Sequence, residues 1–335
     1  MAGVSSPAMA AAVANAGALG SLGVGATDAA GARRMIRAVR QQSQRSLNVN
    51  VFCHQPAAAD ATVQAAWIEY LRPYFHQFHA EPPTGLREIY RSFAADDAML
   101  AVLLEERPRV VSFHFGLPSA PRLHALREAG IVLLASATNL AEARTAVAAG
   151  VQAVVAQGYE AGGHRGTFDP DGHDDRLSTA VLTRLLAQEL SVPVIAAGGI
   201  MDGSGIAAVL RLGASAAQLG TAFIACQESD ADTGYREALA SDAAFHTVMT
   251  RAVSGRPARC LSNGFTALGA NLAARQVPSY PIAYDAGKAL NAAAKAAGDS
   301  RYGAQWAGQG APLVRTGLTA AELISLLATE LRAAD

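Results

Sequence analysis

The chain has 335 residues, of which 51% are hydrophobic and 16% charged, and its formal net charge is −1. This length is enough for one large domain with a sizeable core, and a near-neutral chain has no electrostatic reason to bind nucleic acid or an anionic membrane. No apolar run reaches the roughly 18 residues of a membrane span, so we expect neither nucleic acid nor membrane as a partner.

The three cysteines, Cys53, Cys226 and Cys260, are far apart and form no C-x-x-C motif. Such spacing fits reduced, buried thiols better than disulfides or a zinc site. The first thirty residues are rich in Ala and Gly but lack the basic segment of a signal peptide. We therefore expect a cytoplasmic protein without a bound metal.

One pattern recurs along the chain: a helical stretch ends in glycine, and an apolar strand follows at once. The glycine ends each helix because it adopts the left-handed conformation at little cost. Short apolar strands that alternate with helices form a parallel sheet covered by helices. The pattern predicts four strands, at residues 19–24, 131–137, 153–157 and 216–220, and further apolar runs predict three more, at 48–52, 110–115 and 193–197.

A (β/α)₈ barrel needs eight strands. Met1–Ser5 reads as a loop that leads into a helix, with Ser6 as N-cap and Pro7 in the first turn, and the strand that should precede this loop is not seen. We expect a TIM (β/α)₈-type barrel whose first strand is missing, through a misassigned start or a truncation. The alternative is an open, doubly wound sheet of seven strands.

Two segments interrupt the alternation of strands and helices. Residues 57–95 are far longer than an ordinary connection and rich in aromatic side chains, and a mostly helical tail follows residue 260. We expect residues 1–56 and 91–260 to form the barrel. Residues 57–90 and 261–335 should form a smaller, mostly helical domain that caps the carboxyl ends of the strands, where barrel enzymes react.

The last two strands end in glycine-rich loops. Gly198 and Gly199 let the backbone approach a ligand, and Gly220 and Thr221 offer N–H groups and a hydroxyl. In many barrels these loops bind a phosphate group. Tight turns that require glycine are the alternative.

A second glycine-rich loop, residues 157–166, follows the predicted strand 153–157 and carries His164. A histidine at the carboxyl end of a barrel strand can act as a general base or stabilise developing negative charge; otherwise it is a hydrogen-bonded surface residue. His114 ends another strand and should point into the mouth or the barrel interior. Asn50 could bind a flavin ring or merely cap its loop. Residues 171–175 fit a solvated turn better than a metal loop.

In the tail, Tyr284 and Lys288 share one helix face, and Tyr280 lies one turn earlier. Two phenols and an ammonium group would bind a small anion, whereas the alternative is a surface helix with an exposed lysine. The chain lacks a Rossmann fingerprint, a P-loop, a G-x-S-x-G elbow and an H-E-x-x-H motif. If a flavin is bound, FMN suits one phosphate site better than FAD.

These residues resemble a known family. Met1–Ser5, the Glu-Ala-Gly-Gly-His motif at 160–164 and the Gly-Gly-Ile-x-Asp-Gly motif at 198–203 are similar to the nitronate monooxygenases, formerly called 2-nitropropane dioxygenases. The last two motifs are shared with flavin-dependent enoyl-acyl-carrier-protein reductases. The tail, at 280–288 and 306–309, resembles the class I nitronate monooxygenases, and the resemblance covers nearly the whole chain.

The resemblance implies FMN-dependent oxidation of alkyl nitronates such as propionate 3-nitronate by O₂, which yields a carbonyl compound and nitrite and serves detoxification. His164 would be the catalytic histidine. Substrate would contact Tyr90, His114, Tyr280, Tyr284 and Lys288. FMN would be held by Met1, Asn50, Gln157, Gly162, Gly163, Gly198, Gly199, Gln218, Leu219, Gly220 and Thr221. The family has a strand and a proline before the residue that matches Met1.

Three other functions stay open. The first is an NAD(P)H-dependent flavin reductase of enoyl thioesters, and the second a flavin-free barrel that binds a phosphorylated substrate. The third is a truncated, inactive flavin-binding protein. We expect a monomer or homodimer whose partners are a small anionic nitronate and O₂.

Overall fold

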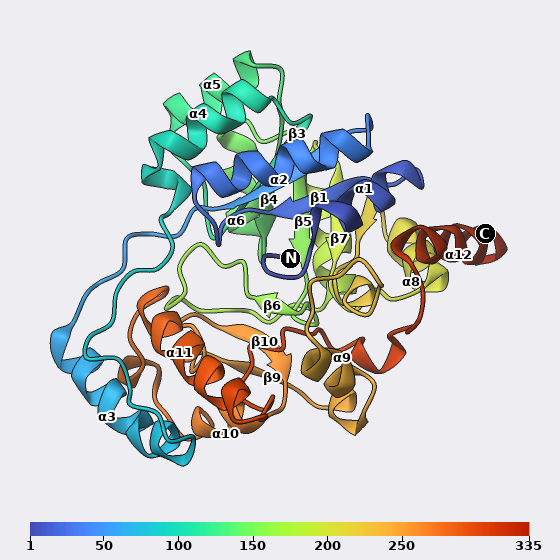
Figure 1. Ribbon diagram of the computed structural model, residues 1–335. Coiled ribbons are helices and arrows are strands. Elements are labelled where there is room, and N and C mark those ends of the chain that lie inside the picture. The colour runs from blue at the N-terminus through green and yellow to red at the C-terminus, as the bar shows by residue number, and fades with distance from the viewer. Residues whose placement is uncertain (335) are drawn as a thin grey trace.

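A curled parallel sheet forms the centre of the molecule in the computed structural model, which describes residues 1–334 (Figure 1). Its strands follow one another in chain order, without the reversal that marks a doubly wound sheet. This order and the surrounding helices identify a fold of the (β/α)-barrel type. The strands are β1 (Gly20–Gly23), β2 (Leu47–Phe52), β3 (Val110–His114), β4 (Val132–Ala137), β5 (Ala153–Gln157), β7 (Val194–Ala197) and β8 (Ala216–Gln218).

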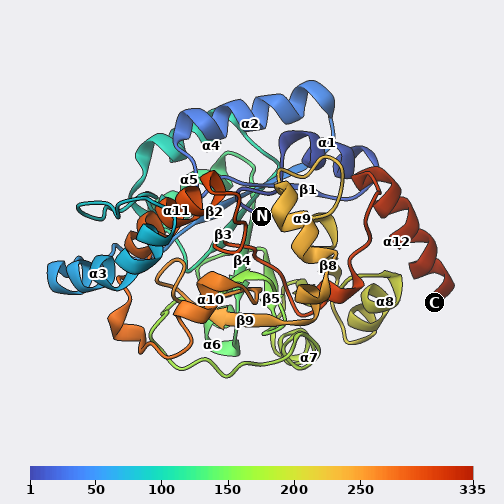
Figure 2. The same cartoon turned by 60° about the horizontal axis from the view of Figure 1, so that its bottom comes forward.

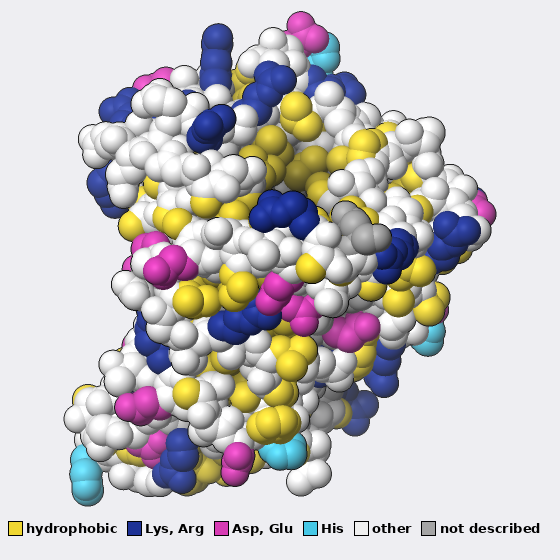
Figure 3. Space-filling model, turned by 90° about the vertical axis from the view of Figure 1, so that its right-hand side faces the viewer, with side chains coloured by type: hydrophobic (Ala, Val, Ile, Leu, Met, Phe, Trp, Pro, Cys, Tyr) yellow, Lys and Arg dark blue, Asp and Glu magenta, His cyan; other side chains and the backbone are white. Residues whose placement is uncertain are grey.

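All seven predicted strands are confirmed within a few residues at each end. Among the described residues no ladder joins β1 to β8, so these two strands are the edges of the sheet. Ala216 and Gln218 of β8 are exposed, whereas β5 is buried along its whole length. Figure 3 views the side on which α8 and α12 lie, and it shows a hollow lined by hydrophobic side chains.

Helices surround the strands (Figure 2). The glycines that end four of the predicted helical stretches, Gly17, Gly130, Gly150 and Gly213, all have φ between 76° and 103°, as a left-handed helix end requires. The helices are α1 (Pro7–Asn15), α2 (Ala29–Gln42), α4 (Asp97–Glu106), α5 (Ala120–Glu128), α6 (Leu140–Ala148), α7 (Thr179–Glu189), α8 (Gly203–Arg211) and α12 (Ala320–Ala334).

A second group of elements lies beside the carboxyl ends of the strands (Figure 1). A small antiparallel sheet has the order β6-β10-β9. The aromatic insertion forms α3, which packs on α11 through an apolar cluster that includes Trp67, Phe75 and Leu290. The elements are β6 (Gly163–His164), β9 (Thr247–Thr250), β10 (Ala258–Leu261), α3 (Ala61–Gln77), α9 (Thr233–Leu239), α10 (Gly264–Leu268) and α11 (Ile282–Ala296).

Single turns of 3₁₀ helix complete the connections, at η1 (Phe93–Ala95), η2 (Thr221–Phe223), η3 (Asp242–Phe245), η4 (Ala274–Gln276) and η5 (Ala311–Leu313). Among residues 1–334, no helix combines the length and apolar character needed to cross a bilayer.

The predicted boundaries between barrel and cap stay a prediction, and the contacts of three elements, β9, β10 and α12, bear on them. β9 and β10 lie in the range assigned to the barrel, yet they pair with β6 rather than with the large sheet. α12 lies in the range assigned to the cap, yet it packs on α8 and α1. The apolar face of α12, with Leu323 and Leu327, joins a cluster that contains Met9 of α1, which explains its position outside the barrel.

The contact between α8 and α12 yields a prediction. A Cβ on Gly203 would overlap the Glu330 side chain and the Leu331 backbone, and the Gly203 amide donates to Glu330 Oε2 at 3.0 Å. We expect Gly203→Ala to lower the free energy of unfolding by roughly 1–3 kcal/mol, because α12 must shift. Urea titration measures this change.

Gly205→Ala on the same helix is the matched control. A Cβ there meets its neighbours at 3.4 Å, an ordinary contact distance. We expect this substitution to raise stability by roughly 0.5–1 kcal/mol, because alanine favours the helix. A Gly203→Ala protein as stable as the unsubstituted chain would contradict the inferred packing.

Candidate active site

A cavity of about 540 Å³ opens at the carboxyl ends of the strands. Residues from the large sheet, from β6 and from α11 line it together. Of the residues singled out from the sequence, the cavity is lined by Met1, Asn50, Tyr90, His114, Gln157, Gly162, Gly163, His164, Gly198, Gly199, Gln218, Gly220, Thr221, Tyr280, Tyr284 and Lys288.

Leu219 is the exception among the predicted site residues. Its side chain packs in the apolar clusters around Ile200 and Met201, outside the cavity lining. Neighbouring residues of an extended chain point to opposite sides, so Gln218 and Gly220 face the cavity while Leu219 does not. Only the backbone of Leu219 is left for a contact with a ligand.

The corner of the cavity at the ends of β7 and β8 is built from bare backbone. Gly198 and Gly199 have φ of 123° and 69°, and a Cβ on Gly198 would lie 3.0 Å from the Ala161 nitrogen. Within residues 1–334, the N–H groups of Gly199, Gly220 and Thr221 donate no hydrogen bond. Clustered free N–H groups are suited to bind an anion such as phosphate.

Polar side chains fill the floor of the cavity. Asn48 Nδ2 donates to Ser21 Oγ at 2.8 Å and to Ser112 Oγ at 3.0 Å, and Ser112 Oγ donates to Asn50 Oδ1 at 2.9 Å. Asn50 Oδ1 accepts this bond, while the side-chain N–H groups of Asn50 donate to no described residue and remain for a ligand. Ser21, Asn48 and Ser112 were not predicted as site residues from the sequence, although Asn48 and Asn50, two apart in one strand, must face the same side.

Hydrogen bonds tie the glycine-rich loop to the strand ends. Gln157 Nε2 donates to the His164 carbonyl at 3.0 Å, while Gln157 Oε1 accepts from the Gly166 amide at 2.7 Å. Both ends of the Gln157 carboxamide therefore hold the loop, and only its second N–H remains for a cofactor. His114 Nε2 lies 3.1 Å from the same carbonyl, and His114 Nδ1 lies 3.0 Å from Ser136 Oγ.

His114 is a fixed, uncharged group. A carbonyl oxygen can only accept, so Nε2 carries the proton and Nδ1 accepts from the Ser136 hydroxyl. Burial lowers the pKa of His114 to about 4, and so the ring is neutral at pH 7. With both nitrogens occupied, His114 orders the wall of the cavity and has no proton to exchange with a ligand.

His164 lies in a box of aromatic rings. Its ring centroid is 5.6 Å from Phe115, 5.3 Å from Tyr280 and 4.9 Å from Trp306. Desolvation by this box, followed by the nearby His114 and Arg256, holds the pKa of His164 well below its ordinary value of 6.5. The side chain is therefore neutral at physiological pH.

A cation and three phenols also line the cavity. Lys288 Nζ lies 4.8 Å from the centre of the Tyr90 ring and 5.6 Å from that of Tyr284, and no carboxylate of residues 1–334 pairs with it. Burial raises the pKa values of Tyr90, Tyr280 and Tyr284, which keeps all three protonated. The Tyr280 hydroxyl is buried without a partner among the described residues. This arrangement suits a small anion.

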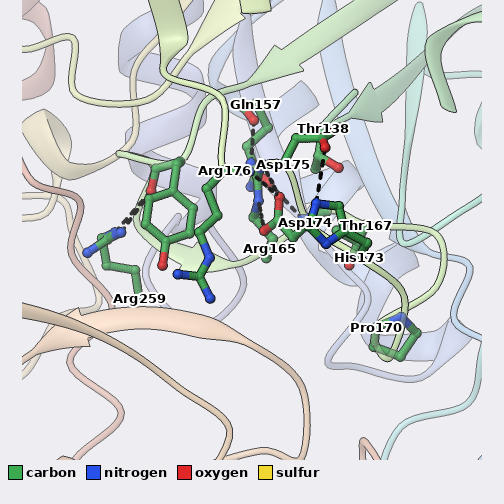
Figure 4. A network of polar contacts seen from close by, with 12 residues as sticks. Thr138, Gln157, Arg165, Thr167, Pro170, His173, Asp174, Asp175, Arg176 and Arg259 are labelled. Carbon is green, nitrogen blue, oxygen red and sulfur yellow. Dashed lines mark hydrogen bonds and ion pairs between the residues drawn. The ribbon is translucent and has the colours of Figure 1, made fainter. Parts of the chain in front are cut away.

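Two arginines, Arg165 and Arg259, fix the glycine-rich loop 157–166 through ion pairs and hydrogen bonds (Figure 4). Arg165 forms a two-pronged ion pair with Asp174, with N–O distances of 2.8 and 2.9 Å. Arg259 donates to the Tyr159 carbonyl at 3.0 and 3.1 Å, and its guanidinium lies over the Tyr159 ring. Asp174 therefore holds Arg165 of the glycine-rich loop in place. Among the described residues, no cluster of His, Cys, Asp and Glu could bind a metal ion.

Comparisons with known proteins agree with this geometry. The family model described as nitronate monooxygenase matches residues 1–330. A nitronate monooxygenase of Paraburkholderia phytofirmans is 63% identical, covering 99% of this chain and 90% of the relative. One from Pseudomonas aeruginosa is 52% identical, covering 99% and 94%.

Solved structures give the same result. The nitroalkane oxidase of Streptomyces ansochromogenes has a TM-score of 0.91 and 41% identity, and the match covers 99% of this chain and 93% of that one. FabK of Thermotoga maritima has a TM-score of 0.70 and 28% identity, with coverage of 98% and 90%. The matches over the full length, at up to 63% identity, show that the chain is an enzyme of the nitronate monooxygenase family.

Proposed function

We propose that this chain uses FMN to oxidise small alkyl nitronates, such as propionate 3-nitronate, with O₂ to a carbonyl compound and nitrite. The observation that carries the proposal is the unpaired Lys288 beside the phenols of Tyr90 and Tyr284, in the same cavity as a corner of free backbone N–H groups. The first feature suits an anionic substrate, and the second suits the phosphate of a cofactor.

The residues present fit FMN. Gly198, Gly199, Gly220 and Thr221 would hold the phosphate, because the three glycines carry no side chain and the N–H groups of all four residues have no acceptor within residues 1–334. The carboxamide of Asn50 would bind the ring system. The buried Asn48 Oδ1, which has no partner among the described residues, indicates a polar ligand nearby. Bound here, FMN would supply the electron acceptor for the nitronate.

The chain's own side chains bind and orient the substrate. Lys288 attracts the anionic nitronate, and the protonated phenols of Tyr280 and Tyr284 donate hydrogen bonds to its oxygens. The aromatic box around His164 excludes water from the reacting end of the cavity. A nitronate is already deprotonated, so it needs no base; only a neutral nitroalkane would have to transfer its α-proton to His164.

A direct assay tests the proposal. The FMN-loaded protein is mixed with propionate 3-nitronate without oxygen and then with oxygen, while the flavin spectrum, O₂ uptake and nitrite are followed. Nitrite and O₂ uptake without NADPH support the proposal. Flavin reduction by NADPH alone, without nitrite, would contradict the proposal and favour the alternative of an NAD(P)H-dependent flavin reductase.

Lys288 provides a sharper test. We expect Lys288→Met to raise KM for the nitronate about tenfold with a smaller change in kcat, because a partly exposed charge contributes mainly to binding. Lys295→Met is the matched control: Lys295 lies two turns further along α11 and pairs with Asp232, away from the cavity. Equal changes in both variants would exclude a specific role for Lys288.

The binding of the nitronate should also depend on pH. Partial desolvation, opposed by Asp285, holds the pKa of Lys288 below its ordinary 10.5. The ammonium group is charged below this pKa, so KM should be constant near neutrality and rise as the pH increases through it. Steady-state kinetics from pH 6 to 10 measure this rise of KM, which should be absent in Lys288→Met.

A further prediction concerns the proposed phosphate site at Gly198, Gly199, Gly220 and Thr221. FMN and riboflavin differ only in the phosphate, so their affinities for the apoprotein isolate its contribution. We expect FMN to bind at least 100-fold more tightly, because several charge-assisted hydrogen bonds are lost with riboflavin. Fluorescence titration gives both constants. Similar affinities would show that the glycine loops bind no phosphate.

A further inference from the structure

The loop between β9 and β10, which was not singled out from the sequence, contacts His164 and two aromatic residues that pack against it. Ser254 Oγ lies 2.9 Å from His164 Nε2. The Arg256 guanidinium lies 4.1 Å from the centre of the Phe115 ring. Gly255 has φ of 89°, and a Cβ on it would lie 2.6 Å from the Tyr280 nitrogen. Loop 254–256 therefore contacts the histidine and two of its aromatic neighbours.

Ser254 is completely buried, so its hydroxyl must find partners within the protein. Besides His164 Nε2, the Arg256 carbonyl lies 3.3 Å away and the Arg256 amide 3.5 Å away. If the hydroxyl donated to His164, the Arg256 carbonyl would have no donor within the described residues. If the hydroxyl donates to that carbonyl, its oxygen accepts from His164 Nε2–H, and every group has a partner.

We propose that Ser254 is a positioning residue, which accepts a hydrogen bond from His164 Nε2–H and thereby leaves the unprotonated Nδ1 as the histidine atom available to a cavity ligand. Nδ1 has no hydrogen-bond partner within residues 1–334, and His164 lines the cavity. This role rests on the proposed function, because the free lone pair of Nδ1 matters only if a substrate binds in the cavity.

The groups around His164 favour the neutral form of its imidazole ring over the charged imidazolium. His114, Arg256 and His54 all lower its pKa, in addition to desolvation, and the phenols of Tyr280 and Tyr284 pack against it. No carboxylate of residues 1–334 pairs with the ring to favour the imidazolium. A neutral imidazole carries one proton, and its hydrogen bonds decide which nitrogen holds it.

Nitrogen-15 NMR of the ¹⁵N-histidine-labelled holoenzyme reads the tautomer directly. The signals of His164 are assigned among the eight histidines by their loss in His164→Gln. We expect protonated Nε2 and unprotonated Nδ1 in the unsubstituted protein, and loss of this pattern in Ser254→Ala. A protonated Nδ1, or an unchanged pattern in Ser254→Ala, would overturn the proposal.

Thr183→Val is the matched control. Thr183 has a fully buried hydroxyl on α7 and does not line the cavity, so its loss should leave the His164 pattern unchanged. The measurement on the unsubstituted protein decides the tautomer even if Ser254→Ala does not fold. It is also independent of turnover, so a protein that makes no nitrite but shows protonated Nε2 would contradict the proposed function alone.

Discussion

The carbonyl oxygen of His164 joins the two sheets of the molecule, and the candidate site depends on this contact. It accepts from Gln157 at the end of β5 and from His114 at the end of β3. His164 itself belongs to β6, whose partner is β10. One buried acceptor thus orients two strand ends, determines the tautomer of His114 and places the His164 ring over the cavity. A buried acceptor of this kind is costly to leave unpaired, so these groups are held together.

The same burial determines which groups of the site carry charge. His54, His114 and His164 are uncharged at neutral pH, because desolvation lowers the pKa of each. The phenols stay protonated for the same reason. Arg256 remains charged even though burial lowers its pKa to about 10. Around His164 the cavity therefore presents neutral donors and acceptors, and the Lys288 ammonium group lines the same cavity, which suits an anion in a poorly hydrated space.

Local patterns predicted most of the large sheet. Every strand is a short apolar run, and four of the seven follow a helix-ending glycine closely, so these signals lie within about ten residues of chain. The glycine-rich corner was visible for the same reason, since Gly198, Gly199 and Gly220 follow their strands within two residues. The small sheet was not predicted: β6 has two residues, and its partner β10 lies almost a hundred residues further on. The position of α12 depends on its apolar face, which sequence periodicity shows without naming the surface it packs on.

The sequence by itself determined the parallel strands, the glycine-rich corner and the chemical nature of His164, Tyr284 and Lys288, because neighbouring residues specify these features. Only the tertiary structure decided how they are used. Ser254 and His164 are 90 residues apart, and nothing in the local sequence of either indicates the other. The occupied carboxamide of Gln157, the outward side chain of Leu219 and the neutral histidines also depend on distant groups. Burial and hydrogen-bond partners arise only when the chain is folded, and these determine protonation and orientation.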